Sequence, residues 1–286
     1  MERAEKKHNK QSIRALLDSN GIKASKSLGQ NFLVDSNIPE KIVKLSGIDK
    51  SCTVLEVGPG LGALTAELGR AAGYVTAVEL DKRFVPILQD MFKEQKNVSI
   101  IQGDILKLNI KDLLKDRTDE PIRHVCANLP YNITTPAITA FIEAEMFTSI
   151  TVMIQKEVAE RICAKPGTSE YGAFTVYANY HSKPEILFDV SPECFSPRPK
   201  VTSSVVKMEL RTEQLLQKND EKMFFKIVRA AFGQRRKTLV NALYAVFEKT
   251  HTKELIEKAV ISSGFDPRVR GEVLGIEDFA SLSQLL

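Results

Sequence analysis

The tetrapeptide Asn128-Leu129-Pro130-Tyr131 combines residue types that can activate an amino group on a nucleobase. The exocyclic nitrogen of adenine is a weak nucleophile because its lone pair is delocalised into the ring. The side-chain oxygen of Asn128, with a main-chain carbonyl held by the Pro130 turn, can accept from both N–H groups and favour a tetrahedral nitrogen. Tyr131 can then stack on the ring. The alternative is a plain Asn-Pro turn after a buried strand, a common use of these residues.

A glycine-rich turn, Glu56-Val57-Gly58-Pro59-Gly60-Leu61-Gly62, lies between an apolar run and a helical stretch. Glycines such as Gly58 and Gly60 let the backbone turn tightly and approach a ligand at the carboxyl end of a strand, where α/β sheets bind cofactors. The spacing is G-x-G-x-G, which differs from the G-x-G-x-x-G of dinucleotide-binding turns. The turn therefore predicts a nucleotide-type cofactor without specifying a dinucleotide.

Acidic residues end the next two strand-like runs. Glu79 stands 21 positions after Gly58, where a carboxylate can accept hydrogen bonds from both hydroxyls of a ribose. Asp104 follows the third run, and its side chain can accept from an adenine amino group. With Asn128 at the end of the fourth run, successive strand ends carry ligand-binding residue types in order. We therefore expect a cofactor site at one edge of a sheet.

The apolar pattern alternates between strand-like and helix-like stretches. Such alternation predicts a parallel sheet with helices on both faces, and two later runs are expected to form a closing hairpin at the sheet edge. The expected strands are Thr53 to Val57, Val75 to Glu79, Val98 to Gln102, His124 to Ala127, Ser149 to Ile154, Glu185 to Val190 and Val201 to Leu210. The expected helices between them include Leu64 to Ala72, Arg83 to Phe92 and Pro136 to Glu143.

The organisation changes after Leu210. Residues 211–220 are polar and are interpreted as a linker, and helical periodicity dominates from Glu221 onward. One buried helix face is expected to carry Phe224, Ile227, Val228, Ala231 and Phe232. We therefore predict three parts: a basic N-terminal extension at 1–25, a sheet domain at 26–212 and a helical domain at 213–286.

The positive charge is concentrated at the two ends of the chain. Residues 1–30 contain seven Lys and Arg against three Asp and Glu, and residues 214–286 contain twelve against nine. Residues 31–213 have 21 against 24, so the formal net charge of +4 arises outside them. This asymmetry favours basic surfaces that dock on a phosphate backbone. A solvated tail and an exposed helix face would give the same count.

Cysteine, histidine and apolar segments give little sign of a metal or a membrane. The four cysteines and four histidines are scattered along the sequence and include no C-x-x-C pair. Metal ligation is therefore not expected, and the cysteines are expected to be reduced thiols. The N-terminus is charged and polar, with no apolar segment behind it. We therefore expect a cytoplasmic protein without a membrane span.

Two further motifs accompany the glycine-rich turn and the tetrapeptide, which is followed by Asn132. They are Lys26-Ser27-Leu28-Gly29-Gln30-Asn31-Phe32-Leu33 and Phe195-Ser196-Pro197-Arg198-Pro199-Lys200-Val201. Together the motifs resemble one enzyme family, the small-subunit ribosomal RNA adenine N6,N6-dimethyltransferases. The resemblance extends from about Gln11 to the C-terminus. It implies S-adenosylmethionine as cofactor and a seven-stranded class I methyltransferase sheet, Rossmann-like, with a small all-helical C-terminal domain.

The same resemblance implies roles for individual residues. Asn31 and Leu33 would lie by the methionine end of the cofactor, with Gly58 beneath it. Glu79 would hold the ribose and Asp104 the adenine amino group. Asn128 would stand where the methyl group meets its acceptor. The implied reaction dimethylates N6 of two adjacent adenines in the 3′-terminal hairpin loop of small-subunit rRNA, within an immature 30S particle, and we expect a monomeric enzyme.

The chemistry of such a transfer makes modest demands on the protein. A sulfonium methylates strongly and leaves as a neutral group, so alignment and exclusion of water suffice, without a metal or a covalent nucleophile. The amine can release its proton to solvent, so no general base is required. The target adenine must be unstacked. We expect Tyr131 and Phe195 to flank it, each stacking with on the order of 1–3 kcal/mol, although Phe195 can also be a core residue.

Two groups of cations are candidate RNA contacts. Arg198 and Lys200 flank the proline-rich loop and either bind phosphate or are simply solvated. Arg235, Arg236 and Lys237 are adjacent, on an expected helix start, and we hypothesise that they bind phosphate. Because neighbouring residues fan out around a helix, only part of that cluster would face one RNA surface.

Two alternative functions remain open from sequence alone. One is the related antibiotic-resistance group of adenine methyltransferases acting on 23S rRNA, which tends to carry Ile where Leu129 stands. The other is a ribosome-assembly or transcription factor that keeps the fold without catalysis. Two departures from the family pattern lie away from the proposed chemistry. The basic N-terminal extension is longer than the family core needs, and Gly271 and Gly275 stand in the C-terminal domain where the family tends to have Ala and Ser.

Overall fold

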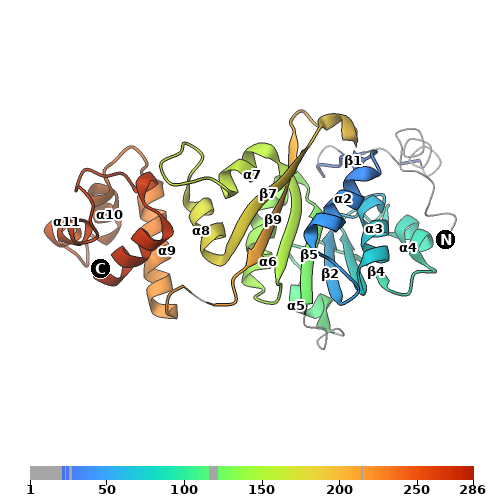
Figure 1. Cartoon of the computed structure of the whole chain (residues 1–286), viewed down its shortest axis with the longest axis horizontal. Helices are drawn as coiled ribbons and strands as arrows, with labels where there is room; N and C mark the ends of the chain where they lie inside the picture. The colour runs from blue at the N-terminus through green and yellow to red at the C-terminus, as the bar shows by residue number, and fades with distance from the viewer. Residues whose placement is uncertain (1–20, 23, 26–27, 116–121, 214) are drawn as a thin grey trace. The chain divides into compact units, whose positions relative to one another are not determined.

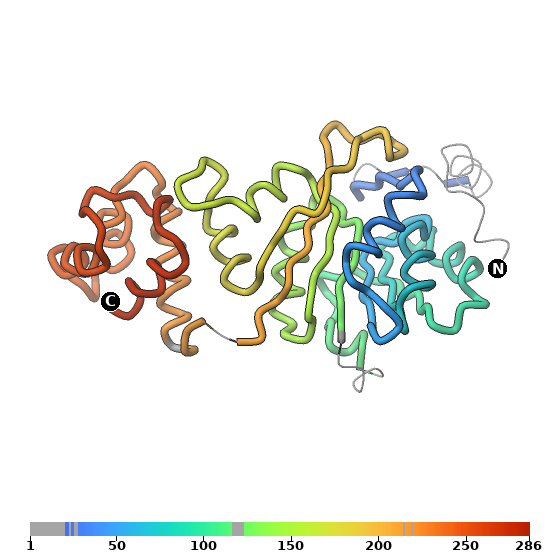
Figure 2. Tube along the Cα trace, in the orientation of Figure 1, coloured from blue at the N-terminus to red at the C-terminus, as the bar shows by residue number. Residues whose placement is uncertain are grey.

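The chain forms two compact units in the computed structural model, which describes residues 21–22, 24–25, 28–115, 122–213 and 215–286. The sheet unit comprises residues up to Ala159 together with Glu185–Leu210, and the helical unit comprises Glu160–Pro184 together with Arg211–Leu286. The trace in Figure 2 therefore passes between the units at residues 159–160, 184–185 and 210–211. Most of the expected N-terminal extension, with Lys26 and Ser27, lies outside the described residues.

This division differs from the predicted boundary at 212/213. The last crossing, at 210–211, is close to the expected boundary. Residues 160–184, however, group with the C-terminal helices instead of the sheet. The reason is apolar packing: Tyr171, Val176 and Tyr180 belong to the same core cluster as the C-terminal helices. The sequence pattern indicated neither α7 (Lys156–Ile162) nor α8 (Ala173–His181).

The sheet unit is built on a seven-stranded sheet of order β4-β3-β2-β5-β6-β9-β7 (Figure 1). Strands β2 to β6 pair in parallel, and β9 pairs antiparallel with β6. This confirms the predicted α/β architecture and the placement of the two late strands at the edge. The strands are β2 (Cys52–Val57), β3 (Tyr74–Glu79), β4 (Val98–Gln102), β5 (Ile122–Asn128), β6 (Ser149–Gln155), β7 (Ser182–Val190) and β9 (Ser203–Leu210).

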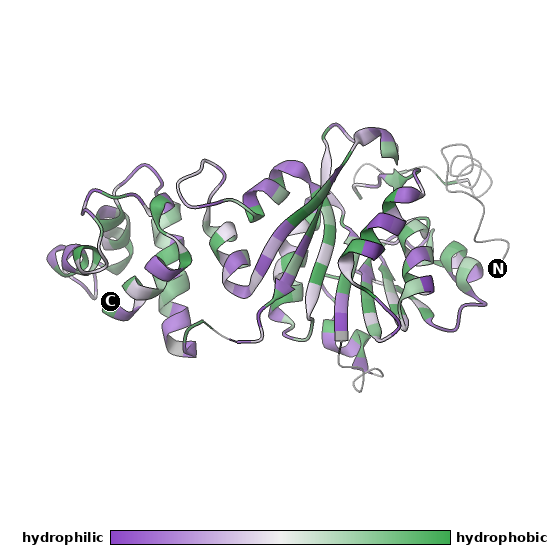
Figure 3. Ribbon diagram, viewed as in Figure 1, coloured by the Kyte–Doolittle hydropathy of each residue, from purple (hydrophilic) through white to green (hydrophobic). Residues whose placement is uncertain are grey.

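Helices enclose the central strands. Every residue of β2 is buried, and because successive side chains of a strand point to opposite faces, both faces of β2 are covered. Green apolar segments run along these strands in Figure 3. Ile42, Leu68 and Val54 share one core cluster, which joins α2, α3 and β2. The helices of this unit are α2 (Asn37–Ser46), α3 (Ala63–Ala71), α4 (Val85–Phe92), α5 (Ile110–Leu113) and α6 (Thr134–Glu143).

A second, two-stranded sheet fixes the segment before α2. Strand β1 (Phe32–Leu33) pairs antiparallel with β8 (Phe195–Ser196), and the Val34 N–H donates to the Cys194 carbonyl at 2.9 Å. Residues 28–33 are thereby held beside a loop more than 160 positions away in the sequence. The sequence pattern did not predict this pairing, because strands of two residues carry no periodicity.

The helical unit has its own apolar core. Helix α9 starts at Lys218, three residues before the predicted start at Glu221. Its expected apolar face is confirmed: Phe224, Ile227, Val228 and Ala231 are buried, and Phe232 packs against them. Besides α8, the unit contains α10 (Leu239–Phe247), α11 (Lys253–Ser262) and α12 (Ile276–Leu285). Among the described residues, no helix is both long and apolar enough to cross a lipid bilayer.

Glycine at position 271 has a steric explanation. A Cβ added to Gly271 would lie 2.6 Å from the Cβ of Ala231 in α9. The short helical turn Gly271–Val273 can therefore approach α9 only without a side chain there. At Gly275 the nearest atom to an added Cβ, a carboxylate oxygen of Asp278, is 3.5 Å away, which is ordinary contact.

Gly62 combines a left-handed backbone conformation with a crowded position. It precedes α3 with φ +77°, a conformation that side-chain-bearing residues rarely adopt. An added Cβ would also lie 2.9 Å from Cε2 of Phe92, a residue 3% exposed at the end of α4. The turn into α3 thus depends on glycine for two independent reasons.

We predict that Gly62→Ala destabilises the protein by about 2–4 kcal/mol, the sum of left-handed strain and overpacking. Gly47→Ala is a matched control. Gly47 also has a left-handed φ of +81° at a helix end, but the nearest atom to an added Cβ is 3.9 Å away. Its cost should be strain alone, about 1–2 kcal/mol. Urea unfolding of both variants measures the difference, and equal losses would contradict the steric contribution.

Candidate active site

The carboxyl ends of β2, β3, β4 and β5 open into one cavity of about 290 Å³. Parallel pairing brings these strand ends to a single edge of the sheet, as the sequence predicted. The segment 28–33, which precedes α2, supplies a further wall. The cavity is lined by every residue predicted to bind the cofactor, namely Asn31, Leu33, Gly58, Gly60, Glu79, Asp104 and Asn128, and also by Pro130 and Tyr131.

The glycine-rich turn lies against the proline of the tetrapeptide. Gly58 and Gly60 have φ values of +68° and +57°. A Cβ on Gly58 would stand 3.6 Å from Cδ of Pro130, and the Gly58 N–H donates to the Val78 carbonyl at 2.9 Å. The turn thus presents bare backbone to the cavity, as the G-x-G spacing predicted.

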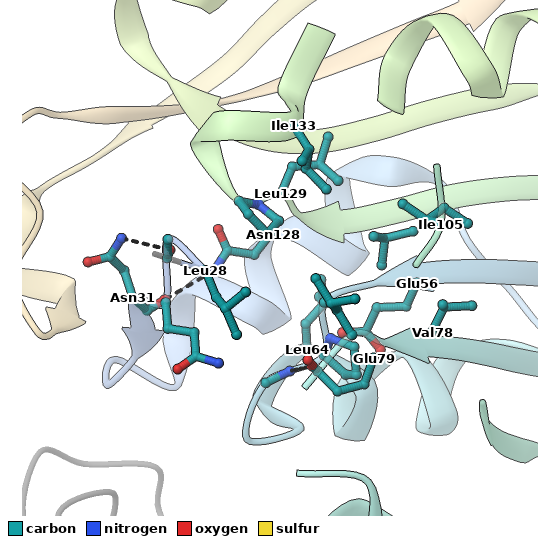
Figure 4. Close-up of a pocket in the computed structure, with 18 of the residues that line it drawn as sticks. Leu28, Asn31, Glu56, Leu64, Val78, Glu79, Ile105, Asn128, Leu129 and Ile133 are labelled. Carbon is teal, nitrogen blue, oxygen red and sulfur yellow. Dashed lines mark hydrogen bonds between the residues drawn. The ribbon is translucent and has the colours of Figure 1, made fainter. Parts of the chain in front are cut away.

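Glu79 is a buried carboxylate held by main-chain donors. Its Oε2 accepts from the Gly60 N–H at 3.0 Å and its Oε1 from the Asp81 N–H at 2.8 Å. Each oxygen keeps a second lone pair for a ligand hydroxyl. Burial raises the pKa of Glu79, although these two hydrogen bonds oppose the shift. Figure 4 shows its side chain beside the glycine turn.

A polar network on the rim joins Glu79 to the N-terminal segment. Asp81 accepts from the Gln30 side chain at 2.9 Å and from the guanidinium of Arg83, which lowers the pKa of Asp81 to about 2. The Gln30 side-chain oxygen in turn accepts from the Ser25 N–H at 2.7 Å. Charge-assisted bonds of this kind fix the loop before β1 at the mouth of the cavity.

Asn128 is oriented by the same N-terminal segment. Its amide nitrogen donates to the Asn31 carbonyl at 3.4 Å, while the Asn31 side chain donates to the Gly29 carbonyl at 3.1 Å (Figure 4). Because the nitrogen of the Asn128 amide is engaged, its oxygen is the atom left to accept from a ligand.

Apolar residues form much of the cavity wall, and sequence reasoning did not single them out. Leu80 and Ile105 immediately follow Glu79 and Asp104, and both line the cavity. Leu80 is 50% exposed despite its apolar side chain. Asp104 itself accepts from the Leu106 N–H at 3.1 Å and pairs with Lys107 at 3.4 Å. An apolar residue directly after a strand-end acid is the signal that could have identified these walls.

Glu56 is a second buried acid in the cavity that the site prediction did not include. Its side chain is 1% exposed and lines the cavity near Glu79. Burial, reinforced by the charge of Glu79, raises its pKa to about 8. Glu56 is therefore mainly protonated at neutral pH, so the two acids do not both carry a charge. Its position in the glycine-rich motif was visible in the sequence, but its burial was not.

The predicted aromatic pair is not assembled. Tyr131, at the start of the turn Tyr131–Ile133, is partly buried and lines the cavity. Phe195 does not line it: the residue is 3% exposed and belongs to the core cluster shared with Val190 and Val205. Pairing of Phe195 with Leu33 in the β1–β8 sheet places it there. The structure therefore corrects the stacking role given to Phe195 in favour of the core alternative.

The predicted RNA-contacting cations lie outside the cavity lining. Arg198 is exposed and pairs with Glu193 at 2.9 Å, and Lys200 is exposed. Residues 235–237 are exposed in the turn between α9 and α10, which corrects the expected helix start. Arg235 donates to the Ser169 carbonyl at 3.0 Å and pairs with Glu272 at 3.3 Å, so it is partly committed within the helical unit.

The cavity offers hydrogen-bond acceptors, bare backbone and apolar walls. Across the described ranges, no group of three or more His, Cys, Asp or Glu side chains is arranged to hold a metal ion. The arrangement can bind a nucleoside-like molecule through its hydroxyls and can present the Asn128 oxygen to an amine.

Comparison with known proteins identifies the family. The family model for "Ribosomal RNA adenine dimethylase" matches residues 21–273. A protein from Caldanaerobacter subterraneus subsp. tengcongensis named "Ribosomal RNA small subunit methyltransferase A" is 43% identical over 265 residues, covering 93% of this chain and 98% of its own. A protein of the same name from Clostridium botulinum is 46% identical over 266 residues, covering 93% and 94%.

Solved structures share the fold. A dimethyladenosine transferase from Plasmodium falciparum superposes with a TM-score of 0.72 at 26% identity, over 88% of this chain and 95% of its own. A 23S rRNA methyltransferase, ErmE, gives a TM-score of 0.70 at 24% identity, over 90% and 99%, which shows the fold alone. On the family match and the identity to its relatives, the chain belongs to the ribosomal RNA adenine dimethylase family and is a methyltransferase of ribosomal RNA.

Proposed function

We propose that this enzyme transfers methyl groups from S-adenosylmethionine to N6 of two adjacent adenines in the 3′-terminal hairpin loop of small-subunit rRNA, giving N6,N6-dimethyladenosines. The observation that carries the proposal is the oriented Asn128 amide, which leaves an acceptor oxygen in a cavity that also contains a ribose-type carboxylate. The names of relatives above 40% identity support small-subunit RNA over 23S RNA as the substrate.

The cavity residues fit the cofactor. Glu79 would accept from the ribose hydroxyls, and Asp104 from the adenine amino group, with Leu80 and Ile105 against the adenine ring. Gly58 and Gly60 would lie beneath the methionine part, near Asn31 and Leu33. When bound, S-adenosylmethionine supplies a methyl group on a cationic sulfonium with a neutral leaving group.

The tetrapeptide would receive the target amine. Asn128 Oδ1 would accept one N–H. Of the turn's carbonyls, that of Pro130 already accepts from the Ile133 N–H at 3.1 Å, whereas the Leu129 carbonyl has no hydrogen-bond partner among the described residues. We assign the second N–H to Leu129. Two acceptors aimed at the amine localise its lone pair toward the methyl donor. A neutral amide avoids leaving a buried charge once the methylated product departs.

RNA docking would extend beyond the cavity. Tyr131 would stack on the extruded adenine. Lys200, Arg236 and Lys237 are exposed and available to phosphate, whereas Arg198 is paired with Glu193 and Arg235 with Glu272. We further propose that the substrate is an immature 30S particle and that the enzyme acts as a cytoplasmic monomer. A non-catalytic assembly factor is disfavoured because the Asn128 oxygen and the Glu79 carboxylate both line the cavity.

We predict that Asn128→Ala lowers the turnover of methyl transfer about 10²- to 10³-fold, the range for removing one preorganised polar group at the reacting centre. Affinity for S-adenosylmethionine should fall much less, since Glu79 and the glycine turn are unchanged. Methyl incorporation into immature 30S particles and calorimetric titration of the cofactor measure the two effects. Full turnover by the variant would refute the role of Asn128, and incorporation into 23S RNA instead would redirect the substrate.

We predict that cofactor affinity weakens on acidification, starting above the ordinary glutamate pKa of 4.5. Protonation of Glu79 removes the negative acceptor that the ribose needs, and burial raises the pKa at which this happens. Glu79→Gln should weaken cofactor binding about 10- to 100-fold, as for a hydrogen bond to a charged group. It should also remove the acidic limb, that is, the fall in cofactor affinity at low pH. Glu94→Gln, at an exposed position in the same unit, is the control. A Glu79→Gln variant with an unchanged acidic limb would exclude this carboxylate.

We predict that replacing Arg235, Arg236 and Lys237 with alanine reduces the salt dependence of RNA binding. Each lost phosphate contact should make the slope of log K against log salt shallower by about 0.7–0.9. A triple replacement of the exposed Lys82, Lys93 and Lys96 in the sheet unit removes equal charge as a control. Equal slopes for the variant and the unmodified enzyme would reject this RNA contact.

A further inference from the structure

The hydroxyl of Tyr131 has a specific partner outside the cavity lining. It lies 2.8 Å from the hydroxyl of Ser203, the first residue of β9. Ser203 is fully buried, whereas Tyr131 is only partly buried. The bond joins residues 72 positions apart and connects the cavity wall to a strand near the sheet edge. Sequence reasoning placed Ser203 inside an expected strand, 201–210, but did not single it out.

The start of β9 is a rigid anchor. Ser203 is paired with Gln155 at the end of β6, and the next residue after β6, Lys156, donates its N–H to the Thr202 carbonyl at 3.0 Å. The backbone on both sides of the Ser203 pair is therefore held by the antiparallel ladder. A hydroxyl fixed to such a ladder has little freedom of its own.

Within the part of the chain that the structure describes, the Tyr131 side chain makes no hydrogen bond other than the one to Ser203. The Tyr131 carbonyl accepts from the Thr134 hydroxyl at 3.3 Å, but this bond does not restrict rotation of the side chain. A phenylalanine would stack on a base as well as a tyrosine does, so the hydroxyl is not needed for stacking itself. Its bond to Ser203 is what restrains the ring. Burial raises the pKa of Tyr131, so the hydroxyl stays protonated at neutral pH.

We propose that Ser203 is a positioning residue for methyl transfer, whose hydroxyl fixes the Tyr131 ring in the orientation that stacks on the extruded adenine. This inference rests on the proposed function, in which Tyr131 contacts the target base. Ser203 itself touches neither the base nor the cofactor. A ring that is already fixed by Ser203 loses less conformational entropy when it stacks on the base, so less of the binding free energy is spent on ordering it.

A double-mutant cycle tests this proposal. Ser203→Ala and Tyr131→Phe remove the same bond from opposite ends, and each should lower kcat/KM for immature 30S particles about two- to tenfold, the range for one neutral hydrogen bond. The combined variant should be no slower than either single variant, because only one bond exists to lose. Affinity of Ser203→Ala for S-adenosylmethionine should stay unchanged.

Ser204→Ala is the matched control. Ser204 is equally buried, and its hydroxyl donates to Asp189 at 2.7 Å and not to Tyr131. It should retain kcat/KM for RNA even if β9 is destabilised. A loss in Ser204→Ala equal to that in Ser203→Ala would assign the effect to general loosening of the strand and overturn the proposal.

The remaining outcomes separate the two levels of inference. Wild-type kcat/KM in Tyr131→Phe, which leaves β9 intact, overturns the role of Ser203, as do losses that multiply in the combined variant. Tyr131→Ala tests the contact with the base: a wild-type rate there would end the stacking role and the Ser203 proposal together. An inactive Tyr131→Ala beside a fully active Tyr131→Phe would end the Ser203 proposal alone.

Discussion

Parallel pairing of β3, β2 and β5 is the constraint on which the site depends. In-register parallel strands must end at one edge, so Glu79 and Asn128 meet there although 48 residues separate them. The same pairing lets the Gly58 N–H continue the ladder to Val78 before the chain turns. The cavity is thus a consequence of the sheet, and the glycine turn shapes its floor.

The sheet alone does not orient the acceptor amide. That requires residues 28–33, which approach from a different part of the sequence and are held by β1–β8 pairing on one side and by the Gln30–Asp81 bond on the other. Through the Asn31 carbonyl this segment determines which atom of the Asn128 side chain is left for a ligand. Disruption of β8 is therefore expected to act on the site through Asn31, without any contact to the cavity.

The sequence predicted those parts of the site that local chemistry determines. Apolar runs followed by Glu79, Asp104 and Asn128 predicted the strands and the ligand-binding residues together. Both the hydrophobic pattern of a strand and the polar residue at its end can be read from a short stretch of sequence. Phe195 was predicted incorrectly because its burial depends on pairing with Leu33, a long-range contact with no local signal. The role of Ser203 was not predicted for the same reason, because its partner Tyr131 is 72 positions away in the sequence. Residues 235–237 were assigned to a helix start because Arg and Lys are good helix formers, whereas α10 begins only at Leu239, after the Thr238 cap.

Two glutamates of the cavity, Glu56 and Glu79, show how the demands of the site oppose the stability of the fold. Glu56 keeps its proton in the folded chain up to a pKa of about 8, whereas in the unfolded chain it ionises near 4.5. Unfolding therefore releases a proton between these values, so the stability that Glu56 withdraws grows as the pH rises through that window. Because Glu56 stays neutral, it adds no second charge beside Glu79. A single glutamate charge at this position suits the ribose hydroxyls of the proposed cofactor, whereas two adjacent charges would repel each other. Apolar packing of the fully buried strand β2, which contains Glu56, offsets the stability that the neutral carboxyl group costs.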